Sequence, residues 1–291
     1  MNKNNHKLIL GTVQFGMGYG ISNVYKKKVS ENEVKEILSF AFKQRIETLD
    51  TATTYGESES ILGNIGVKRF NVITKLPKLP CNKNFEESIL KCTQQSLSNL
   101  KLEFLYGLLV HNAESMLSKQ GEGIYKSLVR LKEEGLVKKI GVSVYHPNEI
   151  KMIMNHYDFD IVQAPFNVID RRLVNTGVMA KMNSAGVELH VRSIFLQGLL
   201  LMNDANRPKK FSKWDKLWRM WNEWLNDSKI TATEACLSYA LSFNEISKIL
   251  VGVDSLQQLQ EICSYTHKNT PKIPIEISEN DTMLLNPSNW K

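Results

Sequence analysis

Several features that define whole classes of protein are scarce or absent in this chain of 291 residues. It has only four cysteines, Cys81, Cys92, Cys236 and Cys263, and none shows Cys-x-x-Cys spacing. Such scattered cysteines argue against a disulfide framework and fit a cytoplasmic location, where thiols stay reduced. There is no run of about 18 apolar residues, so we expect no transmembrane helix and no membrane partner. No long apolar stretch precedes Gly11, which argues against a signal peptide.

An excess of charge of one sign is also small. Lys and Arg number 37 against 30 for Asp and Glu, so the formal net charge is +7 and the pI is about 9.1. The lysines form no single stripe, and no motif that reads nucleic acid is present, so we expect no nucleic-acid partner. Scattered charge predicts a solvated surface, with an anionic ligand as the alternative interpretation.

Strand-like and helix-like patterns alternate along the whole chain. Strand patterns cover residues 7–12, 47–52, 71–76, 106–112, 138–144, 161–167, 187–194 and 248–253. Helix patterns cover residues 31–42, 85–100, 123–135, 148–157, 172–186, 231–243 and 255–265. Ser30 is a candidate N-cap for the first of these helices, and Gly135 and Gly186 stand where helix C-terminal glycines belong.

Eight strand patterns that alternate with helix patterns predict parallel strands joined by crossover helices. We therefore expect a (β/α)8 TIM barrel that forms a single domain over residues 1–291. The alternative, an open doubly wound sheet, usually places a Gly-x-Gly-x-x-Gly turn between the first strand and its helix. The glycines of residues 11–20 do not lead directly into a helix, so we predict a loop there.

A Trp- and Lys-rich insertion, residues 207–228, lies between the seventh strand and the seventh helix. Its tryptophans recur at helical spacing and predict a helix that packs its aromatic face on the barrel. The alternative is that its lysines and a tryptophan edge form part of a substrate mouth. The residues concerned are Trp214, Trp218, Trp221 and Trp224, with Lys209, Lys210 and Lys213.

Ionisable side chains stand at the C-terminal ends of three consecutive predicted strands, where such barrels carry their active sites. Asp50 ends the second strand and Tyr55 follows it, while Lys75 and His111 lie at the ends of the third and fourth. Taken singly, Asp50 reads as a turn cap and His111 as a structural histidine. Lys75 and Tyr55 taken singly read as surface residues. All four together on neighbouring strands favour a catalytic group.

The chemistry of this group is coherent. A phenol has a pKa of about 10, and a nearby ammonium favours its ionised form. Lys75 would supply the ammonium, Asp50 would keep it charged, and His111 would orient a carbonyl. Tyr55 would then protonate the alkoxide that forms when a hydride, supplied by a nicotinamide or flavin, reaches a carbonyl carbon.

With these motifs, the chain resembles the aldo-keto reductases from about residue 8 to about residue 265. The segments LGTVQFG, LDTATTYGESESILG, VITKL, LLVHN, GLVKKIGVSVY, VQAPFN, RSIFLQGLL and ILVGVDSLQQL carry the resemblance. It implies an eight-stranded barrel that interconverts carbonyls and alcohols with NADP(H) and has no Rossmann domain. It also implies a catalytic tetrad matching Asp50, Tyr55, Lys75 and His111, with the tyrosine as general acid.

The resemblance also implies a set of cofactor contacts. These are Gly11, Thr12, Val13, Asp50, Ser143, Gln163, Arg192, Ser193, Gly198, Gly252, Val253, Asp254, Ser255 and Gln258. Two departures concern the nicotinamide: Val144 replaces a frequent asparagine, and Arg192 replaces a frequent stacking tyrosine. A third concerns the adenosine phosphate, because Asp254 and Gln258 lack the positive charge that many members place there. A carboxylate repels a 2′-phosphate and accepts a bond from a ribose hydroxyl, so NAD(H) is the alternative cofactor.

Expectations for the substrate are coarser. Short loops and little chain after the last helix predict an open mouth, which suits a keto-sugar or another polar carbonyl. The basic insertion permits an anion on it. A surface ion pair is the favoured interpretation of Asp170, Arg171 and Arg172, with contact to an anionic substrate as the alternative. A cofactor-binding or regulatory member without turnover is one alternative. A metal-dependent hydrolase is another, although no His-x-His pair supports a metal site. Both a monomer and a dimer remain open.

Overall fold

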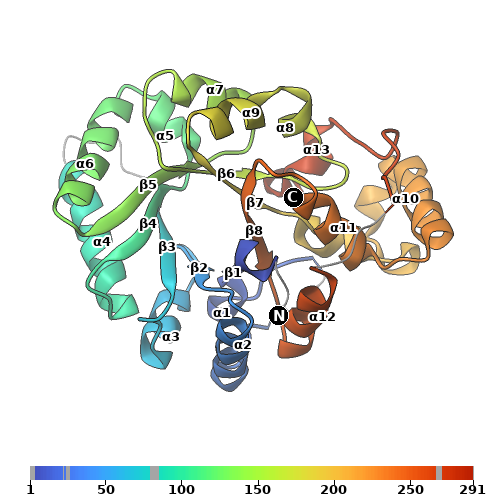
Figure 1. Ribbon diagram of the computed structural model, residues 1–291, viewed down its shortest axis with the longest axis horizontal. Coiled ribbons are helices and arrows are strands. Elements are labelled where there is room, and N and C mark those ends of the chain that lie inside the picture. The colour runs from blue at the N-terminus through green and yellow to red at the C-terminus, as the bar shows by residue number, and fades with distance from the viewer. Residues whose placement is uncertain (1–3, 22, 24–26, 79–84, 267–270, 291) are drawn as a thin grey trace.

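The structure is a computed structural model that describes residues 4–21, 23, 27–78, 85–266 and 271–290. The predicted free cysteine Cys81 lies outside these ranges. Eight parallel strands close into a barrel in chain order, and the helices surround it (Figure 1). The predicted TIM barrel is therefore confirmed. The strands are β1 (Leu8–Gly11), β2 (Thr48–Asp50), β3 (Asn71–Leu76), β4 (Leu105–Val110), β5 (Val137–Ser143), β6 (Ile161–Pro165), β7 (Glu188–Arg192) and β8 (Ile246–Gly252).

The outer helices follow the predicted periodicity closely, and polar caps set where they begin. Ser30 accepts a hydrogen bond from the Glu33 amide at 3.3 Å, which satisfies one of the free N–H groups of the first turn. Gly135 and Gly186 end their helices with φ of 76° and 71°, as predicted. The longer helices are α2 (Glu31–Lys43), α3 (Ser58–Ile65), α4 (Phe85–Leu100), α6 (Gly121–Glu133), α7 (Pro147–Met154), α11 (Ala232–Leu241) and α12 (Leu256–Tyr265), and the short α5 (Ala113–Leu117) precedes α6.

Two local predictions were wrong. The pattern over residues 172–186 is not one helix but two, α8 (Arg172–Asn175) and α9 (Val178–Ser184), because Gly177 adopts φ of 68° between them. The loop after β1 contains a helical turn, α1 (Val13–Gly16), too short for periodicity to reveal.

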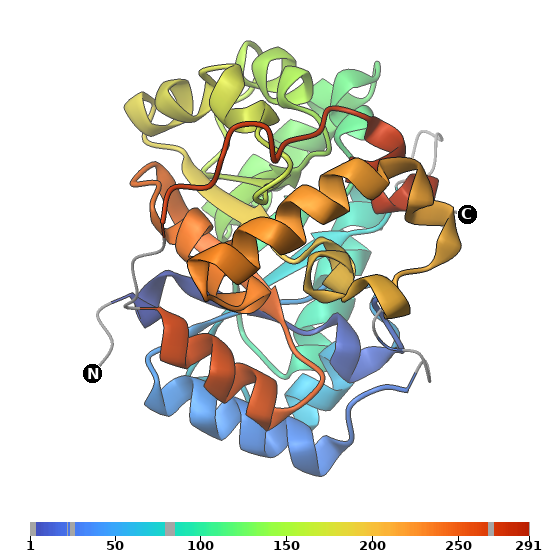
Figure 2. The same cartoon turned by 90° about the vertical axis from the view of Figure 1, so that its right-hand side faces the viewer.

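A second hydrophobic cluster lies beside the barrel and is built around the insertion. It contains α10 (Asp215–Ser228), whose Trp218 and Trp221 are buried and donate their indole N–H groups to the carbonyls of Phe211 and Leu200. The predicted aromatic packing is confirmed. The C-terminal segment, residues 271–290, runs along α10 (Figure 2) and contains α13 (Thr282–Leu285) and the 3-10 turn η5 (Pro287–Asn289).

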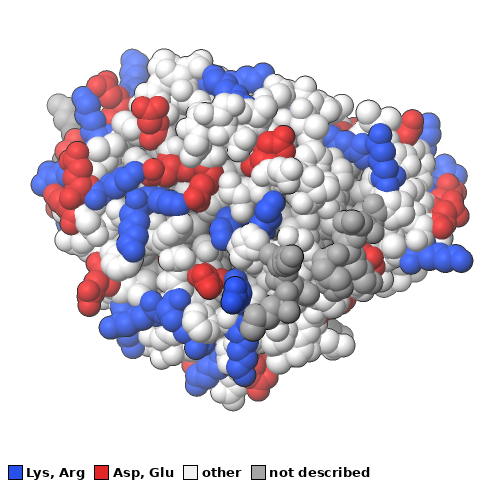
Figure 3. All heavy atoms as spheres, viewed as in Figure 1, with Lys and Arg blue, Asp and Glu red and all other residues white. Residues whose placement is uncertain are grey.

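The surface and the barrel interior limit where chemistry can occur. Lys and Arg are interspersed with Asp and Glu over the face seen in Figure 3. Within the described ranges, no helix is both long and apolar enough to cross a membrane. Inside the barrel, Ile9, Ile73, Leu109 and Ile161 form an apolar layer, so an accessible site has to lie at a barrel end.

Candidate active site

Asp50 and Lys75 form a buried ion pair at the C-terminal end of neighbouring strands β2 and β3. The Lys75 ammonium donates to the Asp50 carboxylate and, at 2.8 Å, to the backbone carbonyl of Thr51. Gln163 on β6 donates its side-chain amide to the second Asp50 oxygen at 2.7 Å. Asp50 is thus held from two sides, and Lys75 has a fixed direction.

Tyr55 and His111 complete the group that the sequence predicted. The Lys75 nitrogen lies 5.0 Å from the centroid of the Tyr55 ring, and the His111 ring meets that ring edge-on with centroids 6.0 Å apart. Burial alone would lower the pKa of Lys75, but the charges and hydrogen bonds of Asp50 and Tyr55 raise it above its usual value. Burial, with Lys75 nearby, lowers the pKa of His111 to about 4. The site therefore combines a charged lysine with a neutral imidazole at neutral pH.

The small residues around Tyr55 form a hydrogen-bonded scaffold. Thr12 donates its hydroxyl to the Asp50 carbonyl at 3.0 Å, and Ser58 donates to the Thr12 carbonyl at 2.9 Å. The Thr51 hydroxyl lies 3.1 Å from that of Ser58. This chain of hydroxyls ties the β1 loop to the β2 loop on which Tyr55 stands. Sequence reasoning missed Thr51 and Ser58, although both lie close to Tyr55 in the chain.

Two glycines let the backbone approach Tyr55 closely. A Cβ atom added at Gly16 would lie 1.8 Å from the Tyr55 carbonyl oxygen, and one at Gly56 would lie 2.6 Å from the Gly16 carbonyl oxygen. Gly56 also has φ of 56°, a left-handed conformation that glycine adopts without strain. The α1 turn therefore packs directly against the loop that carries Tyr55.

A cavity of about 520 Å³ opens beside these residues. It is lined by three tetrad members, Asp50, Tyr55 and His111, while Lys75 is buried behind them. Most of the predicted cofactor contacts line it as well. These are Gly11, Thr12, Val13, Gln163, Arg192, Ser193, Gly198, Gly252, Asp254 and Gln258.

Three predicted cofactor residues do not line the cavity. Ser143 is buried on β5 beside Gln163. Val253 packs in the outer hydrophobic core, so its side chain faces the helices. Ser255 caps α12 by accepting from the Gln258 amide at 3.3 Å. The side chains of Val253 and Ser255 therefore have structural roles instead.

The cavity has features that fit a nicotinamide dinucleotide. Gly11 and Gly252 are partners in the β1–β8 register, and their lack of a Cβ lets the Leu250 and Gln14 side chains of the lining lie against the backbone. The buried Gln14 Oε1 and Asp254 Oδ1 atoms, on two residues of the lining, have no hydrogen-bond partner in the described structure. Burial raises the pKa of Asp254. Among the described lining residues, Arg192 is the only lysine or arginine.

Other lining residues escaped sequence reasoning because they come from distant loops. Tyr19 follows β1 and Gln197 follows β7, yet the Gln197 side-chain amide donates to the Tyr19 hydroxyl at 2.9 Å. Tyr145, Pro287 and Ser288 also line the cavity. The C-terminal segment therefore contributes to the cavity lining, which sequence reasoning did not predict. No local pattern in the sequence signals these neighbours.

The basic insertion does not reach the cavity. Lys210 donates to the Trp290 carbonyl and Lys213 pairs with Asp281 at 2.9 Å, while Lys209 is exposed outside the lining. The insertion lysines that find partners bind the C-terminal segment, so the alternative of a basic substrate mouth was wrong.

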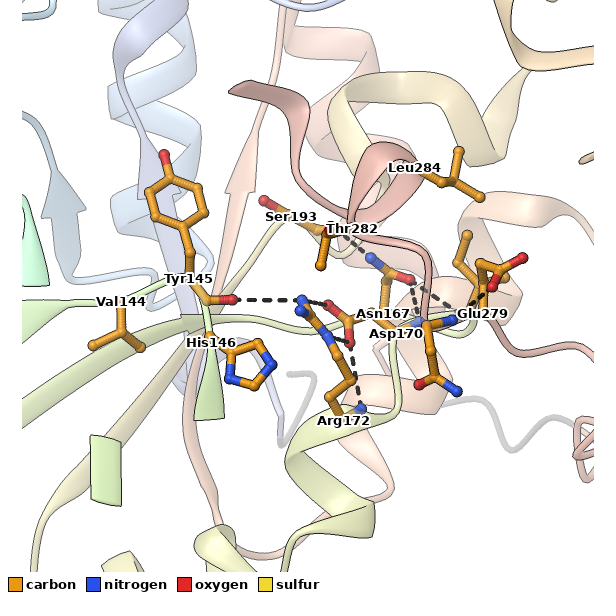
Figure 4. A network of polar contacts seen from close by, with 12 residues as sticks. Val144, Tyr145, His146, Asn167, Asp170, Arg172, Ser193, Glu279, Thr282 and Leu284 are labelled. Carbon is orange, nitrogen blue, oxygen red and sulfur yellow. Dashed lines mark hydrogen bonds and ion pairs between the residues drawn. The ribbon is translucent and has the colours of Figure 1, made fainter. Parts of the chain in front are cut away.

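The ion pair predicted near residue 170 is present, but it is buried rather than on the surface. Arg172 binds both carboxylate oxygens of Asp170, at 2.8 and 2.7 Å, and donates to the Tyr145 carbonyl at 3.4 Å (Figure 4). Arg171 donates to the carbonyls of Pro274 and Ile277 in the C-terminal segment. These residues hold loops together rather than line the cavity.

A metal centre finds no support in the part of the chain that the structure describes, which contains no group of three or more His, Cys, Asp or Glu residues placed to hold a metal ion.

Comparisons with known proteins agree with this geometry. The sequence pattern that defines the Aldo/keto reductase family matches residues 7–277. An uncharacterized oxidoreductase of Bacillus subtilis, YqkF, is 22% identical over 79% of this chain and 81% of its own. The NADH-specific methylglyoxal reductase of Escherichia coli is 21% identical over 95% of this chain and 92% of its own. The holo form of the aldo-keto reductase AKR11C1 from Bacillus halodurans superimposes with a TM-score of 0.73 at 17% identity, covering 91% of this chain and 88% of that one.

Proposed function

This chain belongs to the aldo/keto reductase family, and we propose that it transfers a hydride between a nicotinamide dinucleotide and the carbonyl carbon of a polar substrate. The observation that carries the proposal is the convergence of Tyr55, His111 and the buried Asp50–Lys75 pair at one cavity. In the reductive direction the bound nicotinamide supplies the hydride, and the chain's own residues bind and protonate the oxygen.

Each residue of the group has one role in this proposal. His111, neutral above a pKa of about 4, hydrogen-bonds the carbonyl oxygen and orients it. Tyr55 gives its hydroxyl proton to that oxygen as negative charge develops there. Lys75, kept charged by Asp50, stabilises the phenolate left on Tyr55. Solvent returns the proton, and in the oxidative direction the same transfers run backwards.

The substrate is proposed to be a keto-sugar or a sugar-derived carbonyl. The mouth beside Tyr55 and His111 is lined by the hydroxyls of Tyr19 and Tyr145 and by the amide of Gln197. Such a lining offers several hydrogen bonds at fixed positions, which suits a compound with several hydroxyl groups.

For the cofactor we propose that the preference for NADPH over NADH is relaxed, or shifted to NADH. Asp254, Gln258 and Glu261 line the α12 side of the cavity, and no described lysine or arginine lines it there. A 2′-phosphate would meet carboxylates, whereas a ribose hydroxyl can donate to the Asp254 carboxylate. The relative from Escherichia coli is named as NADH-specific. Titration calorimetry checks this, and an NADPH preference above about a hundredfold, or about 2.7 kcal/mol, would contradict it.

The test of the function is the Tyr55→Phe variant, assayed through the reduced-nicotinamide absorbance with a panel of aldehydes, ketones and sugars. We expect turnover to fall at least about a hundredfold, because the proton donor is lost. Cofactor affinity should change little. Tyr125→Phe is the matched control, since it removes a tyrosine hydroxyl that donates to the Asp158 carbonyl and does not line the cavity. Equal rates for wild type and Tyr55→Phe, or cofactor binding without any turnover of the panel, would overturn the proposal.

A further inference from the structure

Two departures from the family pattern, Val144 and Arg192, are parts of one arrangement. The Arg192 guanidinium donates to the Val144 carbonyl at 3.0 Å and lies 4.4 Å from the centroid of the Tyr145 ring. Its other terminal nitrogen donates to the Ser193 hydroxyl at 3.3 Å. The loop after β5 and the end of β7 thus meet in a cation–aromatic stack, which we call the stacked pair, Tyr145 and Arg192.

The loop after β6 is hydrogen-bonded to the backbone of Tyr145 and to that of Ser193, next to Arg192 (Figure 4). Arg172, itself clamped by the buried Asp170, donates to the carbonyl of Tyr145. Asn167 donates its side-chain amide to the carbonyl of Ser193, next to Arg192, at 3.2 Å. The backbone of Tyr145 and that of Ser193, which follows Arg192, are therefore anchored to the same loop. The Arg192 guanidinium is itself held by its bonds to the Val144 carbonyl and the Ser193 hydroxyl.

The stacked pair lies beside the place that a hydride donor has to occupy. Ser143, Gln163 and Arg192 end or approach the ends of the consecutive strands β5, β6 and β7, and Tyr145 and Arg192 line the same cavity as Tyr55 and His111. A carbonyl whose oxygen contacts Tyr55 and His111 needs the reducing ring within a few ångströms of its carbon. A flat ring over these strand ends would face the planar Arg192 guanidinium, which also stacks on aromatic faces.

We propose that the stacked pair supports the nicotinamide ring and that its positive charge selects the redox state of the cofactor. This inference rests on the proposed function. The reduced ring is neutral and the oxidised ring carries a positive charge. Arginine stays protonated at every working pH, so it repels the oxidised ring and not the reduced one. A tyrosine at this position carries no charge, and the face of its ring would attract the oxidised nicotinamide instead of repelling it. The site therefore binds NADH more tightly than NAD⁺ and favours carbonyl reduction followed by release of oxidised cofactor.

The experiment measures dissociation constants by titration calorimetry with NADH and with NAD⁺, without any substrate. Arg192→Gln should reduce the preference for NADH by about tenfold, which corresponds to about 1.4 kcal/mol, mainly through tighter binding of NAD⁺. Arg192→Lys keeps the charge and should keep most of the preference. Arg69→Gln is the control, because Arg69 stacks on Phe42 at 4.5 Å outside the cavity and should change neither constant. Thermal unfolding establishes that each variant is folded.

The outcomes separate this inference from the proposed function. If wild type binds both cofactors and Arg192→Gln leaves their ratio unchanged, the inference is wrong while hydride transfer stands. The same holds if Arg192→Gln impairs only the turnover of anionic substrates, which would make Arg192 a substrate anchor. The inference is also wrong if Arg192→Lys loses the preference for NADH as fully as Arg192→Gln does. The preference would then depend on the geometry of the arginine side chain and not on its charge. Failure of wild type to bind any nicotinamide cofactor would contradict the proposed function itself.

Discussion

The Lys75 ammonium and the Asp50 carboxylate are hydrogen-bonded to each other with side-chain exposures of only 1% and 2%. A buried ion pair of this kind is costly to desolvate, and it is held here by further bonds from Gln163 to Asp50 and from Lys75 to the Thr51 carbonyl. The pair holds the positive charge of Lys75 in a fixed position next to Tyr55.

Replacing Lys75 by Met should destabilise the protein by about 3–5 kcal/mol, because it leaves the Asp50 carboxylate buried without a counter-charge. Urea denaturation measures this loss. The double variant Asp50→Asn with Lys75→Met should be destabilised by clearly less than the sum of the two single variants. Additive effects would show that the pair is not coupled. Turnover should fall in all three variants.

The Gly16→Ala variant should lower turnover by displacing the loop that carries Tyr55. The new methyl group has no room, since its position lies 1.8 Å from the Tyr55 carbonyl oxygen. Gly135→Ala is the matched control: Gly135 has φ of 76° and no atom within 4 Å of an added Cβ. That change should cost about 1 kcal/mol of stability through backbone strain and leave turnover unchanged. Wild-type turnover in Gly16→Ala would contradict the close packing.

The pH dependence of stability should show the lowered pKa of His111. In the folded state this pKa is about 4, below the usual 6.5, so the unfolded state binds the proton more strongly. Stability should therefore decline as pH falls from 6.5 toward 4, by at most about 1.4 kcal/mol per pH unit for one proton, and should not change above this window. The buried His190, whose pKa burial also lowers, adds a decline of the same sign.

The His111→Gln variant isolates the share of His111 in that decline. Denaturant titrations at several pH values should give a shallower loss of stability for the variant than for wild type below pH 6.5. Identical slopes would show that His111 titrates normally in the folded protein. In wild type, the profile of kcat/KM should likewise lack an inflection near the ordinary pKa of histidine.

Trp221→Ala should destabilise the protein by about 3–5 kcal/mol, because it opens a cavity in the second hydrophobic cluster and leaves the Leu200 carbonyl without its indole partner. Trp224→Ala is the control on the same helix: Trp224 is only half-buried and stacks on Trp221 at 5.6 Å. Its loss should be clearly smaller. Equal losses, measured by thermal unfolding, would mean that α10 does not bury its face as the structure shows.

Much of this architecture follows from local patterns in the chain. Strand and helix periodicities are set within a few residues, so β3 and α4 begin and end where their patterns do. The alternation then requires parallel strands, whose C-terminal ends lie on one face of a barrel. That is why the amino-acid sequence alone predicts that Asp50, Lys75 and His111 lie together, although they are far apart along the chain. The segments that carry the resemblance to the aldo-keto reductases include these strand ends.

The tertiary structure decided the contacts between loops. Leu196 and Gln197 adopt φ of 48° and 53°, conformations that no local pattern predicts, and they bring the Gln197 amide to Tyr19, 178 residues away. Lys210 and Lys213 of the insertion contact the C-terminal segment, and the Arg192 guanidinium stacks on the Tyr145 ring. Which partner a loop side chain meets depends on the folded paths of two distant segments, and composition and periodicity carry no record of those paths. The sequence by itself determined the barrel and the residues around Tyr55, and only the fold determined what surrounds the cavity that they face.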